Sequence, residues 1–198
     1  LNILKRAEML AELGYVAFAI DMYGEGRVAD HPKDAGTFSS SVMKNFDLSK
    51  ERFIKAMEVV KELNFVDKNK IGAIGYCFGG GVVLNMARLN IDIKGVVSFH
   101  GSLSKAVDYT GPTSTKILVC NGADDRMVGG DAILRFKQEM DSIKANYEFI
   151  NYPNSTHGFT NPEATINGEK FQIGLAYNKE ADIESWKKMQ AFFNQIFN

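Results

Sequence analysis

The stretch Lys70–Leu89, KIGAIGYCFGGGVVLNMARL, decides the fold that this sequence encodes. Its first part, KIGAIGY, is an apolar run with strand character, and its second part, FGGGVVLNMARL, has apolar residues at helical spacing. Between them stands Cys77, with Gly75 two positions before it and Gly79 two positions after it. A strand that turns into a helix at one residue either displays that side chain or buries it. The rest of the sequence helps to decide between the two.

Working outward from this stretch, strands and amphipathic helices alternate along the chain. Such alternation predicts a parallel sheet with helices on both faces, and parallel sheets bind their ligands at the carboxyl ends of the strands. We therefore expect a three-layer α/β fold with a mostly parallel sheet, and a glycine- and charge-rich loop over 21–38. The expected strands are YVAFAID (15–21), KIGAIGY (70–76), IKGVVSFHG (93–101), TKILVCNG (115–122) and YEFINYP (147–153); the expected helices are 1–14, 53–63, 78–89, 132–143 and 181–197, the last with Ile183, Trp186, Met189, Phe193 and Ile196 facing inward.

Length, composition and charge restrict the class of protein. The 198 residues, of which 45% are hydrophobic, suffice for a single α/β domain over 1–198. A formal net charge of -1 from interspersed acids and bases leaves no basic block for nucleic acid or an anionic membrane. No apolar run reaches the roughly 18 residues of a membrane span, and the first residues lack the order of a signal peptide. We therefore expect a cytoplasmic protein without nucleic-acid or membrane partners.

The turn at Cys77 has three interpretations. In the first, the glycines let a helix pack closely on a strand, and the cysteine is merely a small buried residue. In the second, the glycine-rich turn binds a phosphate group, but neither GxGxxG nor GxxxxGK[ST] is present. In the third, GYCFG is a nucleophile elbow of the form GxCxG, which displays the sulfur at a strained strand-to-helix turn.

The elbow interpretation makes physical demands that this stretch meets. A side chain two residues before or after the nucleophile would collide with the adjoining strand or helix, so we expect both Gly75 and Gly79 to be required sterically. The turn also places Cys77 at a helix N-terminus, where the dipole and the free amides favour the reactive thiolate. The backbone N–H of Phe78 would then point at the oxyanion that develops during attack.

A nucleophile elbow needs an acid and a histidine, in that order, each just after a later strand. TKILVCNG is followed by Asp124 and Asp125, and YEFINYP is followed by His157. His100 ends the strand IKGVVSFHG, where we consider it as a substrate contact, and Cys120 falls inside a buried strand as a core residue. These placements favour the nucleophile interpretation over the other two.

The sequence resembles the dienelactone hydrolase family of α/β-hydrolases from its first residue to its last. The match rests on GYCFGG around Cys77, GADDRMV around Asp125, STHGF around His157 and GYVAFAIDMYG early in the chain. The family pattern GxxDxxV falls on Gly122, Asp125 and Val128, which selects the second of the two aspartates as the acid. The resemblance therefore implies an α/β-hydrolase fold with a triad of Cys77, His157 and Asp125.

The resemblance also implies a reaction, the cleavage of a small-molecule ester or lactone through an acyl-enzyme, without a metal or organic cofactor. Cys77 would attack the carbonyl, His157 would hold the thiol proton and later activate water, and Asp125 would orient the imidazole. The aromatic residues of the last helix fit either core packing or a dimer contact, so we expect a monomer or a homodimer.

Two departures from the family pattern bear on the substrate and the fold. Members that act on dienelactone carry arginines where this sequence has Glu25 and Asn161. Tyr23 and Arg27 remain as candidate substrate-binding residues, and we expect a neutral or differently charged ester as the substrate. The family fold also begins with strands that precede the first helix seen here. We therefore expect a segment upstream of Leu1 to complete the sheet. A signal peptide in that segment would not be seen in this sequence.

Three alternatives to ester hydrolysis stay open. The same triad serves a thioesterase or an acyltransferase, since both run through the same acyl-enzyme. A thiol of lowered pKa also suits a redox sensor, although no resolving cysteine is evident. A non-catalytic module with this fold is the third, because the sequence accounts for only half of an oxyanion hole.

Overall fold

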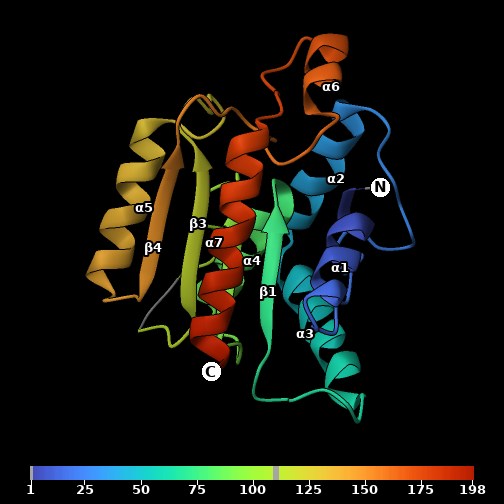
Figure 1. The fold of residues 1–198 in the computed structure, drawn as a ribbon, viewed down its shortest axis with the longest axis vertical. Coiled ribbons are helices and arrows are strands. Elements are labelled where there is room, and N and C mark those ends of the chain that lie inside the picture. Colours follow the sequence, from blue (N-terminus) through green and yellow to red (C-terminus); the bar gives the residue numbers. More distant parts are fainter. Residues whose placement is uncertain (1, 109–111) are drawn as a thin grey trace. The chain divides into compact units, whose positions relative to one another are not determined.

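The structure is a computed structural model that describes residues 2–108 and 112–198. The chain is organised in two compact units, residues 1–68 and residues 69–198. The described elements of the first unit are all helices, and the second unit contains the sheet (Figure 1). The expectation of a single domain over the whole chain stays a prediction.

The first unit consists of helices α1 (Asn2–Glu12), α2 (Pro32–Lys44) and α3 (Phe46–Glu62). Helix α2 begins inside the segment 21–38, which the sequence predicted to be a loop. Two features stabilise its start, because Pro32 fills the first helical position and the Nδ1 atom of His31 accepts the Lys33 N–H at 3.1 Å. The glycine and charge content of the segment did not reveal this helix start, and the loop prediction is wrong over the second half of the segment.

The segment YVAFAID (15–21) is not a strand, although the sequence predicted one. Its backbone is irregular, and two of its large apolar side chains are about half exposed, Val16 at 45% and Phe18 at 49%. A strand needs a neighbour to satisfy its backbone N–H and C=O groups, and the described part of this unit contains no strand. Apolar composition alone was therefore not sufficient to form a strand here.

The second unit contains a four-stranded sheet in the order β1-β2-β3-β4, which confirms the predicted fold class. All three neighbouring pairs are parallel, with Gly72 beside Gly95 and Gly95 beside Lys116. Parallel neighbours need a crossover connection between them, and this requirement places helices on the faces of the sheet. The strands are β1 (Gly72–Tyr76), β2 (Gly95–Phe99), β3 (Lys116–Gly122) and β4 (Tyr147–Tyr152).

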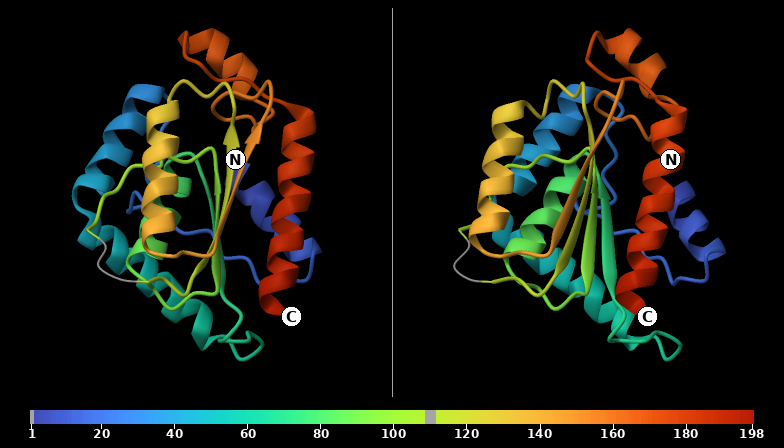
Figure 2. Two further views of the ribbon diagram at one scale, coloured as in Figure 1. Left: turned by 90° about the vertical axis from the view of Figure 1, so that its left-hand side faces the viewer. Right: turned by 60° about the vertical axis from the view of Figure 1, so that its left-hand side comes forward.

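Helices cover both faces of this sheet and give the unit three layers (Figure 2). Helices α4 and α5 lie on one face, and α7 lies on the other. Helix α6, which the sequence did not predict, lies beyond the carboxyl ends of the strands, at the top of Figure 1. The helices are α4 (Phe78–Arg88), α5 (Gly130–Ser142), α6 (Ala164–Phe171) and α7 (Lys179–Phe197).

Helix α7 packs with a face that differs slightly from the predicted one. Trp186, Met189 and Phe193 are buried as predicted, whereas Ile183 is 44% exposed and Phe192 is buried. The cause lies in the sheet. A Cβ atom at Gly95 of β2 would lie 2.5 Å from Ile196 Cδ1 and 2.9 Å from the Phe192 ring, so the glycine provides space for both side chains.

The two central strands form the core of the second unit. Val96 and Val97 of β2 and Leu118 and Val119 of β3 are fully buried. Consecutive residues of a strand point to opposite faces, so full burial of both requires helices on both sides. The continuous apolar runs in the sequence therefore signalled a two-sided sheet correctly.

Candidate active site

The turn between β1 and α4 holds Cys77 in a strained conformation. Its φ of 51° and ψ of -116° lie where side-chain-bearing residues rarely occur, and it is the N-cap residue of α4. Gly75 makes the turn possible, because a Cβ there would overlap the backbone carbonyl of Gly79. The turn displays Cys77 instead of burying it, since this residue is exposed.

The expectation that Gly79 is required sterically is wrong. A Cβ at Gly79 would meet no atom within 4 Å. The glycine that permits close packing on this side of the turn is Gly80, whose added Cβ would lie 2.7 Å from Ser98 Oγ and 2.8 Å from the Cα atom of Gly101. The first turn of α4 therefore packs directly against β2 and the residues that follow it.

Three side chains from three strand ends meet at this turn. His157 Nε2 lies 2.9 Å from Cys77 Sγ, and His157 Nδ1 lies 2.8 Å from Asp125 Oδ2. Cys77 follows β1, Asp125 follows β3 and His157 follows β4, so the parallel sheet brings together residues up to 80 positions apart. A thiol, an imidazole and a carboxylate thus form one chain of hydrogen bonds, which is the arrangement of an activated nucleophile.

Asp125 is held in place by the loop that carries it. Its buried carboxylate accepts the Met127 N–H at 2.8 Å through Oδ1 and faces His157 through Oδ2. Asp124 is exposed, and its backbone N–H donates to the Ser155 carbonyl at 2.9 Å. The aspartate that the pattern GxxDxxV selects is therefore the one beside the histidine.

The electrostatics of the site favour a thiolate paired with an imidazolium. The protein atoms that crowd the Cys77 sulfur raise the pKa of the thiol, but the hydrogen bond and charge of His157 and the Phe78 N–H outweigh this and lower it overall. Burial likewise disfavours a charged imidazole, yet the hydrogen bonds to Asp125 and Cys77 raise the pKa of His157 to about 10. The site therefore pairs a thiol of lowered pKa with a histidine of raised pKa, which favours transfer of the thiol proton to the imidazole.

Phe78 contributes its backbone N–H to the site. It is the first residue of α4, and its N–H is directed at the Cys77 sulfur. An oxygen of a carbonyl group bonded to that sulfur would lie close to the same N–H, so this amide is available for an oxyanion.

His100, a candidate substrate contact from its place at the end of a strand, is buried and does not lie on the rim. The residue is only 3% exposed, and both ring nitrogens have protein partners. Nδ1 accepts the Cys77 N–H at 3.2 Å, and Nε2 lies 2.9 Å from the hydroxyl of Thr160. Thr160 went unnoticed in the sequence because its partner is 60 residues away, and no local pattern marks such a pair.

The two other candidate substrate contacts, Tyr23 and Arg27, belong to the first unit. The ring of Tyr23 packs edge-on against Phe38, with 5.5 Å between centroids. The guanidinium of Arg27 pairs with Glu25, and both side chains are exposed. A substrate-binding role for Tyr23 and Arg27 stays a prediction.

The second thiol has a very different environment. Cys120 is fully buried in β3, as the sequence predicted, and this burial raises the pKa of the thiol to about 12. The hydroxyl of Tyr152 lies 3.9 Å from its sulfur. Cys120 is therefore a protonated core residue at neutral pH, and only Cys77 has the properties of a nucleophile.

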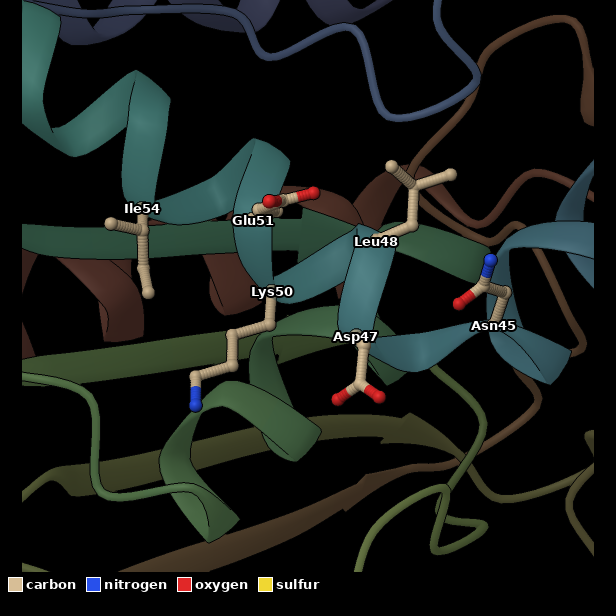
Figure 3. A pocket seen from close by; sticks show the side chains of 6 residues that line it. All are labelled: Asn45, Asp47, Leu48, Lys50, Glu51 and Ile54. Atoms are coloured by element: carbon tan, nitrogen blue, oxygen red, sulfur yellow. The ribbon is translucent and has the colours of Figure 1, made fainter.

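A pocket of about 490 Å³ lies in the first unit, along the start of α3 (Figure 3). Its lining mixes acidic, basic, polar and apolar side chains and contains none of the predicted site residues. This pocket is therefore not the place where Cys77, Asp125 and His157 meet. The lining residues are Asn45, Asp47, Leu48, Lys50, Glu51 and Ile54.

Two kinds of feature are absent from residues 2–108 and 112–198, metal-binding clusters and membrane-spanning helices. In this part of the chain, no group of three or more His, Cys, Asp or Glu side chains is placed to hold a metal ion. Nor does any helix there combine the length and the apolar character needed to cross a membrane.

Comparisons with known sequences give one consistent family. The profile of the Dienelactone hydrolase family matches residues 1–197. The uncharacterized protein K02A2.1 of Caenorhabditis elegans is 32% identical over 151 residues, which cover 75% of this chain and 94% of that protein. A protein of Aquifex aeolicus (strain VF5), provisionally named a carboxymethylenebutenolidase, is 25% identical over 97% of this chain and 80% of its own.

Solved structures agree with the sequence comparisons. A dienelactone hydrolase-like promiscuous phosphotriesterase from metagenomic libraries superimposes with a TM-score of 0.85 and 30% sequence identity. The alignment covers 98% of this chain and 80% of that one.

Proposed function

The chain belongs to the dienelactone hydrolase family, and on that premise we propose that it hydrolyses a small carboxylic ester or lactone through an acyl-enzyme on Cys77. The observation that carries the proposal is the hydrogen-bonded chain from Cys77 through His157 to Asp125, with distances of 2.9 and 2.8 Å. Ester hydrolysis needs a nucleophile and a proton donor for the leaving group, and a thiolate–imidazolium pair supplies both.

The first half of the proposed reaction forms the acyl-enzyme. The Cys77 thiolate attacks the carbonyl carbon, so that a C–S bond forms and the carbonyl electrons move onto oxygen, near the Phe78 N–H. As the tetrahedral intermediate collapses, the C–O bond to the alcohol breaks and His157 donates its proton to the leaving oxygen. Asp125 holds the imidazole in the orientation that permits this transfer.

The second half releases the acid. His157, now neutral, takes a proton from a water molecule as the oxygen of that water attacks the thioester carbon. The C–S bond then breaks, the acid leaves, and the thiolate and imidazolium are restored. The net reaction is ester plus water giving acid plus alcohol, without a change in oxidation state.

The preferred substrate in this proposal is an uncharged ester. The Asn161 side chain accepts the Glu163 N–H at 3.1 Å, and Arg27 is engaged by Glu25. The two positions where the family pattern has arginines therefore offer no free cation to a substrate carboxylate. Dienelactone carries such a carboxylate, and we expect it to be hydrolysed more slowly than p-nitrophenyl acetate. Equal rates for the two compounds would contradict this preference.

A second candidate activity is hydrolysis of phosphotriesters. Its support is the solved relative named a promiscuous phosphotriesterase, at 30% identity over nearly the whole chain. The thiolate would attack phosphorus and expel an aryloxide, and water would then cleave the S–P bond. Diethyl p-nitrophenyl phosphate tests this activity, since continued release of p-nitrophenolate that depends on Cys77 supports it. A single release that ends at one equivalent, or no release, contradicts it.

The decisive experiment is turnover of p-nitrophenyl acetate by the wild type, Cys77→Ala and Cys77→Ser. We expect a burst of p-nitrophenolate followed by steady turnover in the wild type and neither in Cys77→Ala. Cys77→Ser should be slower than the wild type, because the serine hydroxyl is not ionised by the histidine. Cys120→Ala is the matched control and should keep the burst, since that thiol is fully buried. The proposal would be overturned if the wild type, Cys77→Ala and Cys77→Ser were equally inactive while all three kept the circular dichroism of a folded protein.

A further inference from the structure

One buried side chain, His100, contacts both the backbone of Cys77 and the ring of His157. Its ring meets the ring of His157 edge-on, with 5.2 Å between centroids. Its Nδ1 accepts the Cys77 N–H at 3.2 Å, and its Nε2 lies 2.9 Å from Thr160 Oγ1. A single imidazole therefore touches the backbone of the nucleophile, the ring of the base and the loop three residues beyond that base.

These contacts determine which nitrogen of His100 carries the proton. A backbone N–H can only donate, so Nδ1 must be unprotonated where it accepts the Cys77 N–H. The neutral ring then has its proton on Nε2, and this N–H donates to the Thr160 hydroxyl. Because both nitrogens are engaged by protein atoms, the ring acts as a neutral link and not as an acid or base in the reaction.

The link ends at a strained residue. Cys77 has a φ of 51°, and such a conformation persists only when the surroundings hold it. Two acceptors hold its N–H, the Phe99 carbonyl at 3.0 Å and His100 Nδ1 at 3.2 Å. A shift of the peptide group that carries this N–H would move the Cα atom and the sulfur of Cys77 away from the imidazole of His157. Fixing this amide therefore preserves the 2.9 Å contact between sulfur and Nε2.

We propose that His100 is a positioning residue, which fixes the nucleophile turn through the Cys77 N–H and ties that turn to the histidine loop through Thr160. The inference rests on the proposed function, because it takes Cys77 as the nucleophile. The evidence for the inference itself is the pair of hydrogen bonds that His100 makes with the Cys77 N–H and with Thr160. Without the acceptor on the His100 ring, the Cys77 N–H is held by the Phe99 carbonyl alone, the distance from the sulfur to His157 is less well fixed, and the sulfur loses part of its thiolate character.

Two substitutions of His100 separate the two ends of the link. In His100→Asn, the amide oxygen takes the place of Nδ1 and can still accept the Cys77 N–H. In His100→Gln, the longer side chain reaches Thr160 but puts a methylene group near Cys77. Asparagine also tolerates the φ of 40° at this position, so we expect His100→Asn to fold. His31→Asn is the matched control, because His31 accepts a backbone N–H at the start of α2 in the other unit.

The readouts are the pH profile of Cys77 alkylation by iodoacetamide and the kcat and KM for p-nitrophenyl acetate. We expect His100→Gln to raise the alkylation midpoint and lower kcat by about tenfold or more with KM within about twofold, since small misplacements of a reacting group are costly. His100→Asn keeps the acceptor for the Cys77 N–H but loses the Thr160 contact, so it should show a smaller change in both values than His100→Gln. His31→Asn should keep both values near those of the wild type. Identical profiles for His100→Gln and the wild type, or equal losses in His100→Gln and His100→Asn, would overturn the proposal. Alkylation requires no ester turnover, so this test is independent of whether the ester assay succeeds.

Discussion

Asp125 Oδ2 lies 2.8 Å from His157 Nδ1, whereas the neighbouring carboxylate of Asp124 is exposed to solvent. Two adjacent aspartates thus have opposite environments, although the sequence presents them side by side on the same loop. The buried one orients the imidazole and stabilises its charge, and the exposed one contributes only its backbone N–H, which donates to Ser155. Substituting each aspartate in turn therefore tests whether the buried carboxylate is needed for activity.

Asp125→Asn should lower kcat for p-nitrophenyl acetate by at least about 100-fold, because the imidazole loses the partner that fixes its tautomer and orientation. Asp124→Asn is the matched control and should leave kcat within about twofold, since its side chain is exposed. Steady-state kinetics of the two variants measures the difference. Equal activities of the two variants would remove Asp125 from the triad.

The reactivity of Cys77 should depend on pH in a defined direction. Burial raises the pKa of this thiol, but the hydrogen bond and charge of His157 and the Phe78 N–H lower it overall, so the thiolate persists to lower pH than that of an ordinary cysteine. The midpoint of the iodoacetamide alkylation rate against pH should therefore lie below that of free cysteine measured in the same buffers. Mass spectrometry should find the label on Cys77 alone, since Cys120 is buried and its pKa is about 12.

His157→Gln should move this alkylation midpoint upward, toward that of free cysteine. The substitution removes the positive charge that stabilises the thiolate, although the glutamine amide can still donate to the sulfur, and crowding of the sulfur by protein atoms remains. The rate as a function of pH, measured on both proteins in the same buffers, gives the shift. A profile unchanged by the substitution would mean that the imidazole does not activate the sulfur.

Gly75→Ala and Gly79→Ala should have opposite effects on stability. A Cβ at Gly75 would overlap the backbone of Gly79, so we expect a loss of at least about 2 kcal/mol in the free energy of unfolding. A Cβ at Gly79 meets no atom within 4 Å, and alanine is the better helix former, so we expect a gain of about 0.5 kcal/mol. Urea unfolding measures both values. A similar loss in both variants would show that the elbow requires both glycines.

A buried ion pair between α4 and α5 should contribute to stability. Arg88 donates to Glu139 through Nε and Nη2, at 2.9 Å each, and the arginine side chain is only 1% exposed. Glu139→Ala leaves this guanidinium buried without its charged partner, so we expect a loss of about 2–3 kcal/mol in the free energy of unfolding. Glu58→Ala, which breaks the exposed pair with Lys55, is the control and should have no measurable effect. Equal effects of the two variants in urea unfolding would contradict the assignment.

Local patterns were informative wherever the chemistry is local. The apolar runs around Val96 and Leu118 predicted strands that are buried on both faces, and both runs are central strands of the sheet. The order of Cys77, Asp125 and His157 after successive strands was also readable, because parallel strands end at one edge of a sheet. Motif spacing therefore located these three residues before any distance was known.

Local patterns failed where the outcome depends on distant partners. YVAFAID has the composition of a strand, but no strand lies beside it in the described part of its unit, so its backbone stays irregular. Gly79 was expected to be constrained like Gly75, yet the close approach occurs at Gly80, where α4 meets Gly101. The helix start at Pro32 was also missed, because the capping histidine there is not one of the usual capping residues.

The sequence by itself determined the α/β class, the elbow at Cys77 and the membership of a family, because these follow from periodicity and motif spacing along the chain. Only the tertiary structure decided the role of His100. The sequence presented it as a residue at the end of a strand, and the fold places it between Cys77 and Thr160. The physical reason is that a hydrogen bond between residues 60 positions apart leaves no periodic trace in a sequence. It exists only once the strands have paired and brought their ends together.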